Sequence, residues 1–313
     1  MDKKTLHITN GTVLTNILNE LNIAGDKLTW QEMLCEGPTT EQVYSEKFIE
    51  LRKTFFSSHY DIELDISEIN EELDKLNHME NYSEIVLWFE YDLFCHINLI
   101  AVISLIQQKK ITLPLYLVTS GRVRGSKNLK GLSELNSGNL LKHYRDKIKL
   151  TPEDIGLAKT IWGIYCGKDH NLLKPYIVKS SSFIYLNSCL KAHLERFPYT
   201  KDGLNNIERN ILEIIRDTNI KSYHHLLGYA LNYQGYYGYG DLQISRIIDK
   251  LKIFIIESDK SLKLNRKGFE ALLGKHNFAK EIDNNIKYGG VYKFDFQFNK
   301  KLNKLVKTIH NAN

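Results

Sequence analysis

Residues 83–106 read SEIVLWFEYDLFCHINLIAVISLI, and this stretch decides the fold class. Residues 85–89 form an uninterrupted apolar run of strand length, which is typical of a strand buried on both faces of a sheet. The run ends in Glu90-Tyr91-Asp92, and residues 93–106 are apolar enough for a helix that is buried on all sides. A doubly buried strand followed by a buried helix indicates a parallel sheet covered by helices on both faces.

Other segments of the first third extend this alternating pattern. Residues 5–9 form a β-prone run, and the turn Asn10-Gly11 leads from it into apolar residues at helical spacing. Residues 27–30 and 111–118 supply further strands, and residues 41–57 and 66–78 are expected to be acidic helices. The pattern predicts an α/β fold, with a Rossmann-like parallel-sheet domain over residues 1–125.

The rest of the chain changes character twice. Residues 126–202 are expected to form a helical linker region. Residues 203–313 show three helical segments, a hairpin and a closing helix, an order that predicts a winged helix-turn-helix with a terminal strand and a basic tail. The third helix of such a module enters the major groove, so we expect Gln243, Arg246 and Lys250 to contact nucleic acid. Lys260 at the wing tip would meet a phosphate. Winged helices also act as protein-packing modules, which is the alternative.

Three carboxylates follow predicted strands and form the candidate site. Ligands of open α/β sheets lie beyond the carboxyl ends of the strands, where Glu36, Glu90 and Asp92 are placed by the pattern. Like charges repel unless protons or a cation intervene, and Mg²⁺ held by carboxylates and waters suits phosphate substrates. The alternative is structural: Glu36 caps a turn, and Asp92 caps the helix that starts at Leu93.

Smaller signals surround these acids. His7 is either a proton carrier, since imidazole titrates near neutrality, or an ordinary hydrogen-bonded histidine. Backbone N–H groups near a helix start can bind anions, which makes the turn residues candidates for a nucleotide-like ligand. The glycine spacing matches neither a dinucleotide fingerprint nor a P-loop. The candidate ligand-binding residues are Asn10, Gly11, Gly37, Ser120 and Gly121.

Charge is distributed unevenly along the 313 residues. The formal net charge of +5 combines −12 over residues 1–100, +10 over residues 101–200 and +7 over residues 201–313. Either the acidic and basic parts attract each other, or the basic part faces DNA or RNA. Four cysteines without a CxxC pair argue against a disulfide framework or zinc ribbon. No apolar run reaches membrane-spanning length and no signal peptide is evident, so we expect a cytoplasmic protein without a membrane partner.

Five motifs resemble a known family. They are HITNG (7–11), EGP (36–38), LWFEYDL (87–93), RFP (196–198) and GGV (289–291). Together they are similar to the bacterial family catalogued as domain of unknown function 1835, over nearly the whole chain. Members of that family usually carry an acid where this chain has Thr12, and a histidine where it has Cys35 or Tyr91. The resemblance therefore implies a shared site from which this chain has lost an acid and two imidazoles, and it implies no established activity.

The sequence leaves three functions open. The first is a protein that binds a phosphate-bearing ligand or nucleic acid, with metal-dependent phosphoryl transfer or phosphodiester hydrolysis as the reaction class. The second is a ligand-sensing regulator that reads DNA as a homodimer. The third is an interaction module in which the winged helix packs internally.

Overall fold

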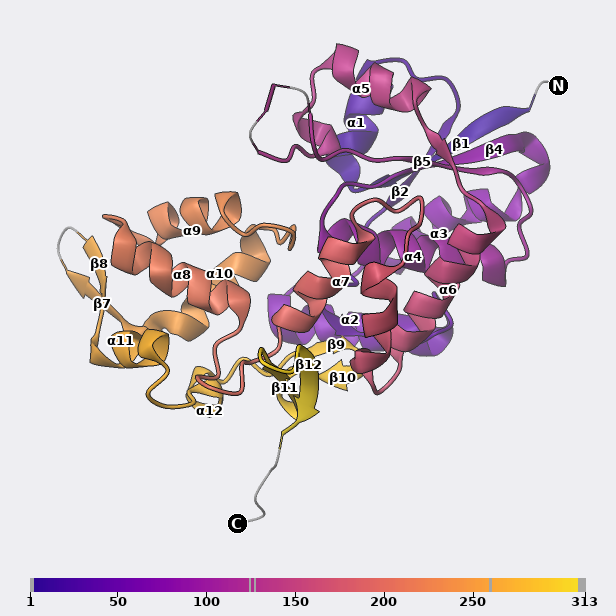
Figure 1. The fold of residues 1–313 in the computed structure, drawn as a ribbon. Coiled ribbons are helices and arrows are strands. Elements are labelled where there is room, and N and C mark those ends of the chain that lie inside the picture. The colour runs from indigo at the N-terminus through magenta and orange to yellow at the C-terminus, as the bar shows by residue number, and fades with distance from the viewer. Residues whose placement is uncertain (1–2, 124, 127, 259–260, 309–313) are drawn as a thin grey trace.

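The computed structural model describes residues 3–123, 125–126, 128–258 and 261–308. Lys260, the expected wing-tip contact, lies outside the described residues. Figure 1 shows a larger lobe built around a sheet and, beside it, a smaller lobe formed mainly by helices.

The five strands of the main sheet lie in the order β2-β1-β4-β5-β6. Strands β1 (Lys4–Asn10), β2 (Asp26–Trp30), β4 (Tyr82–Trp88) and β5 (Leu115–Val118) run parallel, and β6 (Ile148–Lys149) pairs antiparallel with β5. The chain is therefore an α/β protein with a mostly parallel sheet, as the sequence predicts. The short antiparallel edge strand β6 was not expected, because a two-residue strand leaves no periodic signal.

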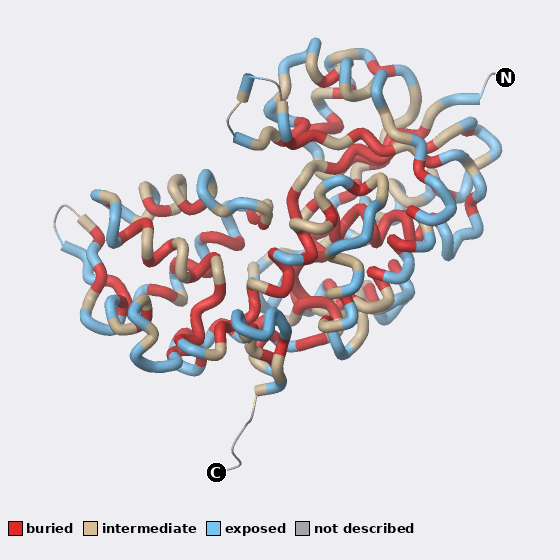
Figure 2. The backbone as a smooth tube through the Cα atoms, viewed as in Figure 1, coloured by how far each residue is buried: buried red, intermediate tan, exposed pale blue. Residues whose placement is uncertain are grey.

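Strand β4 is apolar on both faces because each face meets a different layer. Val86 and Trp88 share a core cluster with residues of α1 (Thr12–Glu20) and α5 (Ser137–Arg145). Ile85, Leu87 and Phe89 belong to the main core with α4 (Leu93–Gln108). In Figure 2 the middle of the central strands and most of α4 are buried. The alternation of side chains along one strand thus supplies both cores of the lobe.

Helices of the first 200 residues complete the large lobe. They are α2 (Glu46–Tyr60), α3 (Ile66–Asp74), α6 (Pro152–Cys166) and α7 (Leu186–Glu195), joined by the 3₁₀ turns Lys75–Asn77, Met79–Asn81, Leu132–Glu134 and His170–Val178. Helix α5 begins at Ser137 because the Asn136 side chain caps it, accepting a hydrogen bond from the Asn139 backbone N–H.

The smaller lobe contains the helices and the hairpin expected from residue 203 onward, and a further short helix, Ala279–Ile282, that was not expected. They are α8 (Asn206–Asp217), α9 (Tyr223–Asn232), α10 (Asp241–Leu251), a 3₁₀ turn (Lys252–Phe254), the antiparallel hairpin β7 (Ile255–Ser258) and β8 (Ser261–Leu264), α11 (Arg266–Leu273) and α12 (Ala279–Ile282). Amphipathic helices such as α8 bury one face here, because Ile207, Ile211 and Ile215 point to the core of the lobe.

The final strands return to the large lobe and cross the expected domain boundary. Strand β9 (Lys287–Gly289) pairs in parallel with β3 (Gly37–Pro38) and antiparallel with β10 (Val291–Tyr292). A 3₁₀ turn (Lys293–Asp295) leads to the hairpin β11 (Phe296–Asn299) and β12 (Lys304–Lys307). The segment predicted as residues 203–313 is therefore divided between the two lobes.

In the part of the chain that the structure describes, no helix combines the length and apolar character needed to cross a membrane.

Candidate functional site

Two of the three expected carboxylates meet at the carboxyl end of β4. Oxygens of Glu90 and Asp92 and the Sγ atom of Cys95 lie within 4.8 Å of one another. Asp92 is the N-cap of α4, and its Oδ1 accepts a hydrogen bond of 2.8 Å from the Cys95 backbone N–H. Oε1 of Glu90 accepts from the backbone N–H and the hydroxyl of Ser133, at 3.2 and 3.3 Å. Asp92 thus caps α4, and Glu90 is held at the start of the 3₁₀ turn Leu132–Glu134.

Burial sets the electrostatics of this carboxylate pair. Loss of hydration raises the pKa of Asp92 to about 7, and the neighbouring Glu90 charge adds to the shift. Burial also raises the pKa of Glu90 and raises the pKa of the Cys95 thiol well above its ordinary value. The thiol therefore stays protonated at neutral pH, and the donor set that fits a hard cation such as Mg²⁺ is the pair of carboxylates.

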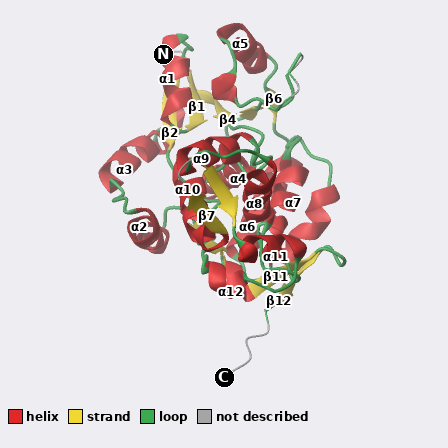
Figure 3. Ribbon diagram, turned by 90° about the vertical axis from the view of Figure 1, so that its left-hand side faces the viewer, coloured by secondary structure: helices red, strands yellow, loops and turns green. Residues whose placement is uncertain are grey.

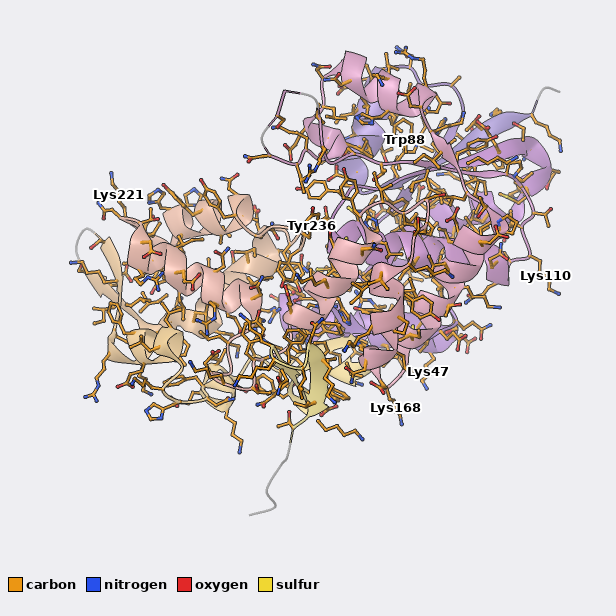
Figure 4. The ribbon with its side chains drawn as sticks, viewed as in Figure 1. Lys47, Trp88, Lys110, Lys168, Lys221 and Tyr236 are labelled. Carbon is orange, nitrogen blue, oxygen red and sulfur yellow. The ribbon has the colours of Figure 1, made fainter. Side chains whose placement is uncertain are left out.

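A loop from the smaller lobe packs against Asp92 and the start of α4. The carbonyl oxygens of Tyr236 and Tyr237 accept hydrogen bonds from the backbone N–H groups of Leu93 and Phe94, at 2.7 and 3.1 Å. Gly238, with a left-handed φ of 67°, lies so close to Asp92 that a Cβ atom there would overlap the carboxyl group. Figure 4 labels Tyr236 between the two lobes. The N–H groups at the start of α4, which attract anions, are thus occupied by carbonyl oxygens of the same chain.

Glu36 does not join Glu90 and Asp92, so the expected three-carboxylate site is wrong in this respect. Its carboxylate forms an ion pair of 2.8 Å with Arg246 of α10 and accepts a hydrogen bond from the Tyr60 hydroxyl. Glu36 is 1% exposed. Strand β2 is followed by a long buried loop rather than by an immediate turn, and this loop carries Glu36 away from the end of β4.

His7 is a structural histidine and not a proton carrier. Its Nδ1 accepts a hydrogen bond of 3.1 Å from the Trp88 indole N–H, and its Nε2 lies 3.0 Å from the Ala24 carbonyl oxygen. Burial lowers the pKa of this imidazole. Both ring nitrogens have partners and the side chain is fully buried, so the ring offers no site for proton exchange with a ligand.

The backbone and side chains of the expected ligand-binding turn on β1 are also engaged. Asn10 donates to Cys95 Sγ and accepts from Asn98, and the Gly11 N–H donates to the Trp30 carbonyl oxygen at 3.0 Å. These bonds fix the start of α1 against α4 and β2. Asn10 therefore touches the carboxylate cluster through Cys95 and does not project into solvent.

The other expected ligand-binding residues have different surroundings. Gly37 is buried in β3 against Arg52. Ser120 donates to the Lys130 carbonyl oxygen at 2.8 Å, and Gly121 packs against the Tyr185 hydroxyl. Ser120 and Gly121 also line a cavity of about 180 Å³ at the end of β5, together with Arg122 and His143. Of the expected turn residues, these two remain candidates for ligand contact.

Helix α10 turns its expected nucleic-acid-reading residues toward the protein. Gln243 is 1% exposed, and its side chain contacts Cys35 Sγ and the Gly240 backbone N–H. Arg246 is bound to Glu36 and to Asn284. Lys250 pairs loosely with Asp283, at 3.8 Å, and stays partly exposed. The expectation that Gln243 and Arg246 contact DNA is therefore wrong, because the interface between the lobes takes up their side chains.

A buried polar network that the sequence does not reveal joins the motif segments. Arg196 is fully buried and donates to the Cys35 carbonyl, the hydroxyls of Tyr239 and Tyr165, and Nδ1 of His193. Its guanidinium stacks 3.7 Å from the Tyr288 ring centroid. Arg196 of the RFP motif thus contacts the residues directly before the EGP and GGV motifs, Cys35 and Tyr288, and the RFP motif was the signal that could have pointed to this network.

Comparisons with known proteins add little to this geometry. No family model matches the chain, and no curated protein does. The chain is similar in structure to the DNA-binding, cleavage and re-ligation domain of Plasmodium falciparum topoisomerase II, with 15% sequence identity and a TM-score of 0.48. The similarity covers 80% of this chain and 42% of that chain, so this chain spans less than half of its length. Membership in the family catalogued as domain of unknown function 1835 stays a prediction.

Asp92→Asn is expected to stabilise the protein above pH 7 and to leave its stability nearly unchanged near pH 4. The folded-state pKa of about 7 lies above the unfolded value of 3.8, so charging Asp92 weakens the fold as pH rises through 7, by at most about 4 kcal/mol. Asparagine is an equally good N-cap. Urea unfolding at pH 4 and pH 8 in EDTA measures the difference, and a variant that is less stable than the natural protein at pH 8 would contradict it.

Proposed function

We propose that the protein binds a phosphate-bearing ligand through a divalent cation held by Glu90 and Asp92 at the carboxyl edge of the parallel sheet. The observation that supports this most directly is the close pair of carboxyl groups at the end of β4, with the pKa of Asp92 raised to about 7. One buried and one half-buried carboxylate at this separation repel unless protons or a cation lie between them. Mg²⁺ commonly takes one or two carboxylates, waters and phosphate oxygens as ligands.

The residues around the pair suggest how the chain would use such a cation. When bound, it would neutralise phosphate charge, which is the main requirement of phosphoryl transfer and phosphodiester hydrolysis. Ser133 and the start of α4 hold the two carboxyl groups in place. His7 is not available as a general base, so we favour ligand binding over a reaction that needs a histidine to accept a proton.

We infer that α8, α9, α10, the hairpin β7–β8 and α11 form a winged-helix module that packs internally. Support comes from the contacts of Gln243 and Arg246 with Cys35 and Glu36, which place the third helix against the large lobe. The outward residues of this helix include Asp241 and Asp249, which would repel phosphates. On this proposal the module covers the cation site with its tyrosine-rich loop, residues 233–239, and the loop must withdraw when a ligand binds.

Mg²⁺ or Mn²⁺ is expected to raise the melting temperature of the protein at pH 8, and pyrophosphate is expected to add to the effect. A ligand that binds only the folded state stabilises it by about 2.7 kcal/mol at 100 times its dissociation constant. Glu90→Gln should abolish the shift, because it removes one of the two anionic ligands.

Glu153→Gln is the matched control, since Glu153 is an exposed acid at the start of α6. This variant should respond to the cation as the natural protein does. An equal shift in Glu90→Gln, or no shift in the natural protein, would refute the proposed site.

A further inference from the structure

The segment Ile62 to Asp74 carries a concentrated negative charge that the other described residues neutralise only in part. It contains six acids and no lysine or arginine. The ion pairs of these acids among the described residues are local, with Glu72 bound to Lys75 and Asp74 to His78. Between described residues, the acidic first third meets the basic remainder at Glu84–Lys147 and Glu36–Arg246, outside this segment. Mutual attraction of the two parts therefore does not account for this acidic segment.

A groove lies between this segment and the edge strand β2. Its cavity measures about 220 Å³. The apolar side chains that line it are Leu28, Trp30, Tyr44, Ile62, Leu64, Ile69 and Leu73. Four acids line it as well: Glu63, Asp65, Glu68 and Glu72. In Figure 3, α3 lies at the outer side of the molecule. The groove thus combines an apolar floor with an acidic rim.

Helix α3 leaves its apolar face incompletely covered. Ile66, Ile69 and Leu73 recur at helical spacing, yet no residue of α3 is fully buried. An amphipathic helix of a globular protein normally buries such a stripe against the core. The remaining apolar surface beside the groove is available to another molecule.

The edge of β2 determines how that molecule would bind. The outward N–H of Thr29 already donates to the Glu72 carboxylate at 2.7 Å. An added strand would have to displace this bond, so strand pairing along β2 is disfavoured. A partner that inserts only its side chains into the groove leaves the hydrogen bond between Thr29 and Glu72 intact.

We propose that this groove is a docking site for a cationic amphipathic segment of a partner protein, whose apolar side chains enter the groove and whose lysines or arginines face the acids of α3. Nucleic acids and anionic membranes carry the wrong charge for this rim. A polyamine has the right charge and no apolar side chains to fill the floor. Apolar burial would give affinity, and the acids would steer association and orientation.

Two synthetic peptides of equal length and charge test the proposal, one with lysines and with leucines at helical spacing, and one in which serine replaces every leucine. Trp30 lines the groove, so binding of the lysine–leucine peptide should change its fluorescence in a saturable manner, and Trp30→Phe should remove that signal. The double variant Glu63→Gln/Glu68→Gln should weaken binding about tenfold.

The matched control is Glu46→Gln/Glu50→Gln, which removes the same charge from exposed positions on α2. It should bind the lysine–leucine peptide as the natural protein does. Equal affinity for the serine peptide, equal weakening in the control variant, or binding of neither peptide would overturn the proposal. Circular dichroism of each variant confirms that the fold is retained.

Discussion

Replacing Arg196 with methionine is expected to lower the free energy of unfolding by about 3 kcal/mol. The substitution leaves two buried acceptors without their donor, the Tyr239 hydroxyl oxygen at 3.1 Å and Nδ1 of His193 at 3.0 Å. Each buried polar group left unpaired costs about 1–3 kcal/mol. Relief of the buried positive charge offsets part of the loss. The Tyr165 hydroxyl keeps its hydrogen bonds to the Leu34 and Cys35 carbonyls, so the loss of its bond from Arg196 costs less free energy.

Urea unfolding of Arg196→Met beside Arg266→Met measures this effect. Arg266 lies on the surface of α11 with 92% of its side chain exposed, so its replacement should change stability by less than about 1 kcal/mol. Arg196→Lys should not restore stability, because one ammonium group cannot replace the planar fork that reaches several acceptors. If Arg196→Met leaves the free energy of unfolding unchanged, the network contributes nothing to the stability of the fold.

Acidification is expected to destabilise the protein steeply below pH 6.5. Burial lowers the pKa of His96 and of His170 to about 4. It also lowers the pKa of His193 well below its ordinary value. Below pH 6.5 these three histidines bind protons in the unfolded chain, whereas in the folded chain they stay neutral. The stability they contribute is therefore complete above pH 6.5 and is lost as pH falls toward 4, by about 3 kcal/mol each for His96 and His170.

The structural reason for these low pKa values is that the rings are enclosed and hydrogen-bonded as neutral groups. His170 lies between the Tyr165 carbonyl oxygen, at 2.9 Å, and His193, at 2.8 Å. His193 in turn accepts from Arg196, whose positive charge opposes protonation of either ring.

The contribution of Asp92 to stability rises as pH falls, which is opposite to that of the histidines. The effect of the histidines is therefore best measured in the Asp92→Asn variant, where the Asp92 carboxyl group is absent. Unfolding free energies at pH 7.5, 6 and 5 should fall progressively in this background, and an additional His170→Gln should flatten the curve. His224→Gln removes an exposed histidine and should leave it unchanged. A stability that does not vary between pH 7.5 and 5 would mean that the buried histidines accept protons without unfolding.

Much of the fold could be predicted because periodicity reports local burial. The apolar run at residues 85–89 gave a central strand, and the acidic and amphipathic segments gave helices near their observed positions. The β3–β9 pairing escaped prediction because two- and three-residue strands leave no periodic signal. Their pairing depends on residues that are 251 positions apart in the chain and meet in space, as Gly37 and Tyr288 do.

The candidate site was predicted in part for a similar reason. Glu90 and Asp92 flank one residue at a strand end, so the local pattern suffices to bring them together. Glu36, Gln243 and Arg246 were misplaced because their partners come from another lobe. Cys95 could have been found, since the N-cap and the third residue of a helix are adjacent. The contacts of the Tyr236 and Tyr237 carbonyls could not be predicted, because every residue has a backbone carbonyl and the sequence does not mark which ones accept.

By itself the sequence determined the layered α/β architecture, the order of the helical elements after residue 203, and the pair of acids that ends the central strand, since each depends on hydrophobic spacing within a short segment. The tertiary structure decided which charges meet. Arg246 binds Glu36 instead of a phosphate, and the loop at residues 233–239 seals the start of α4. Such pairings follow from how the lobes dock, because buried polar groups must find partners wherever the packed chain brings them.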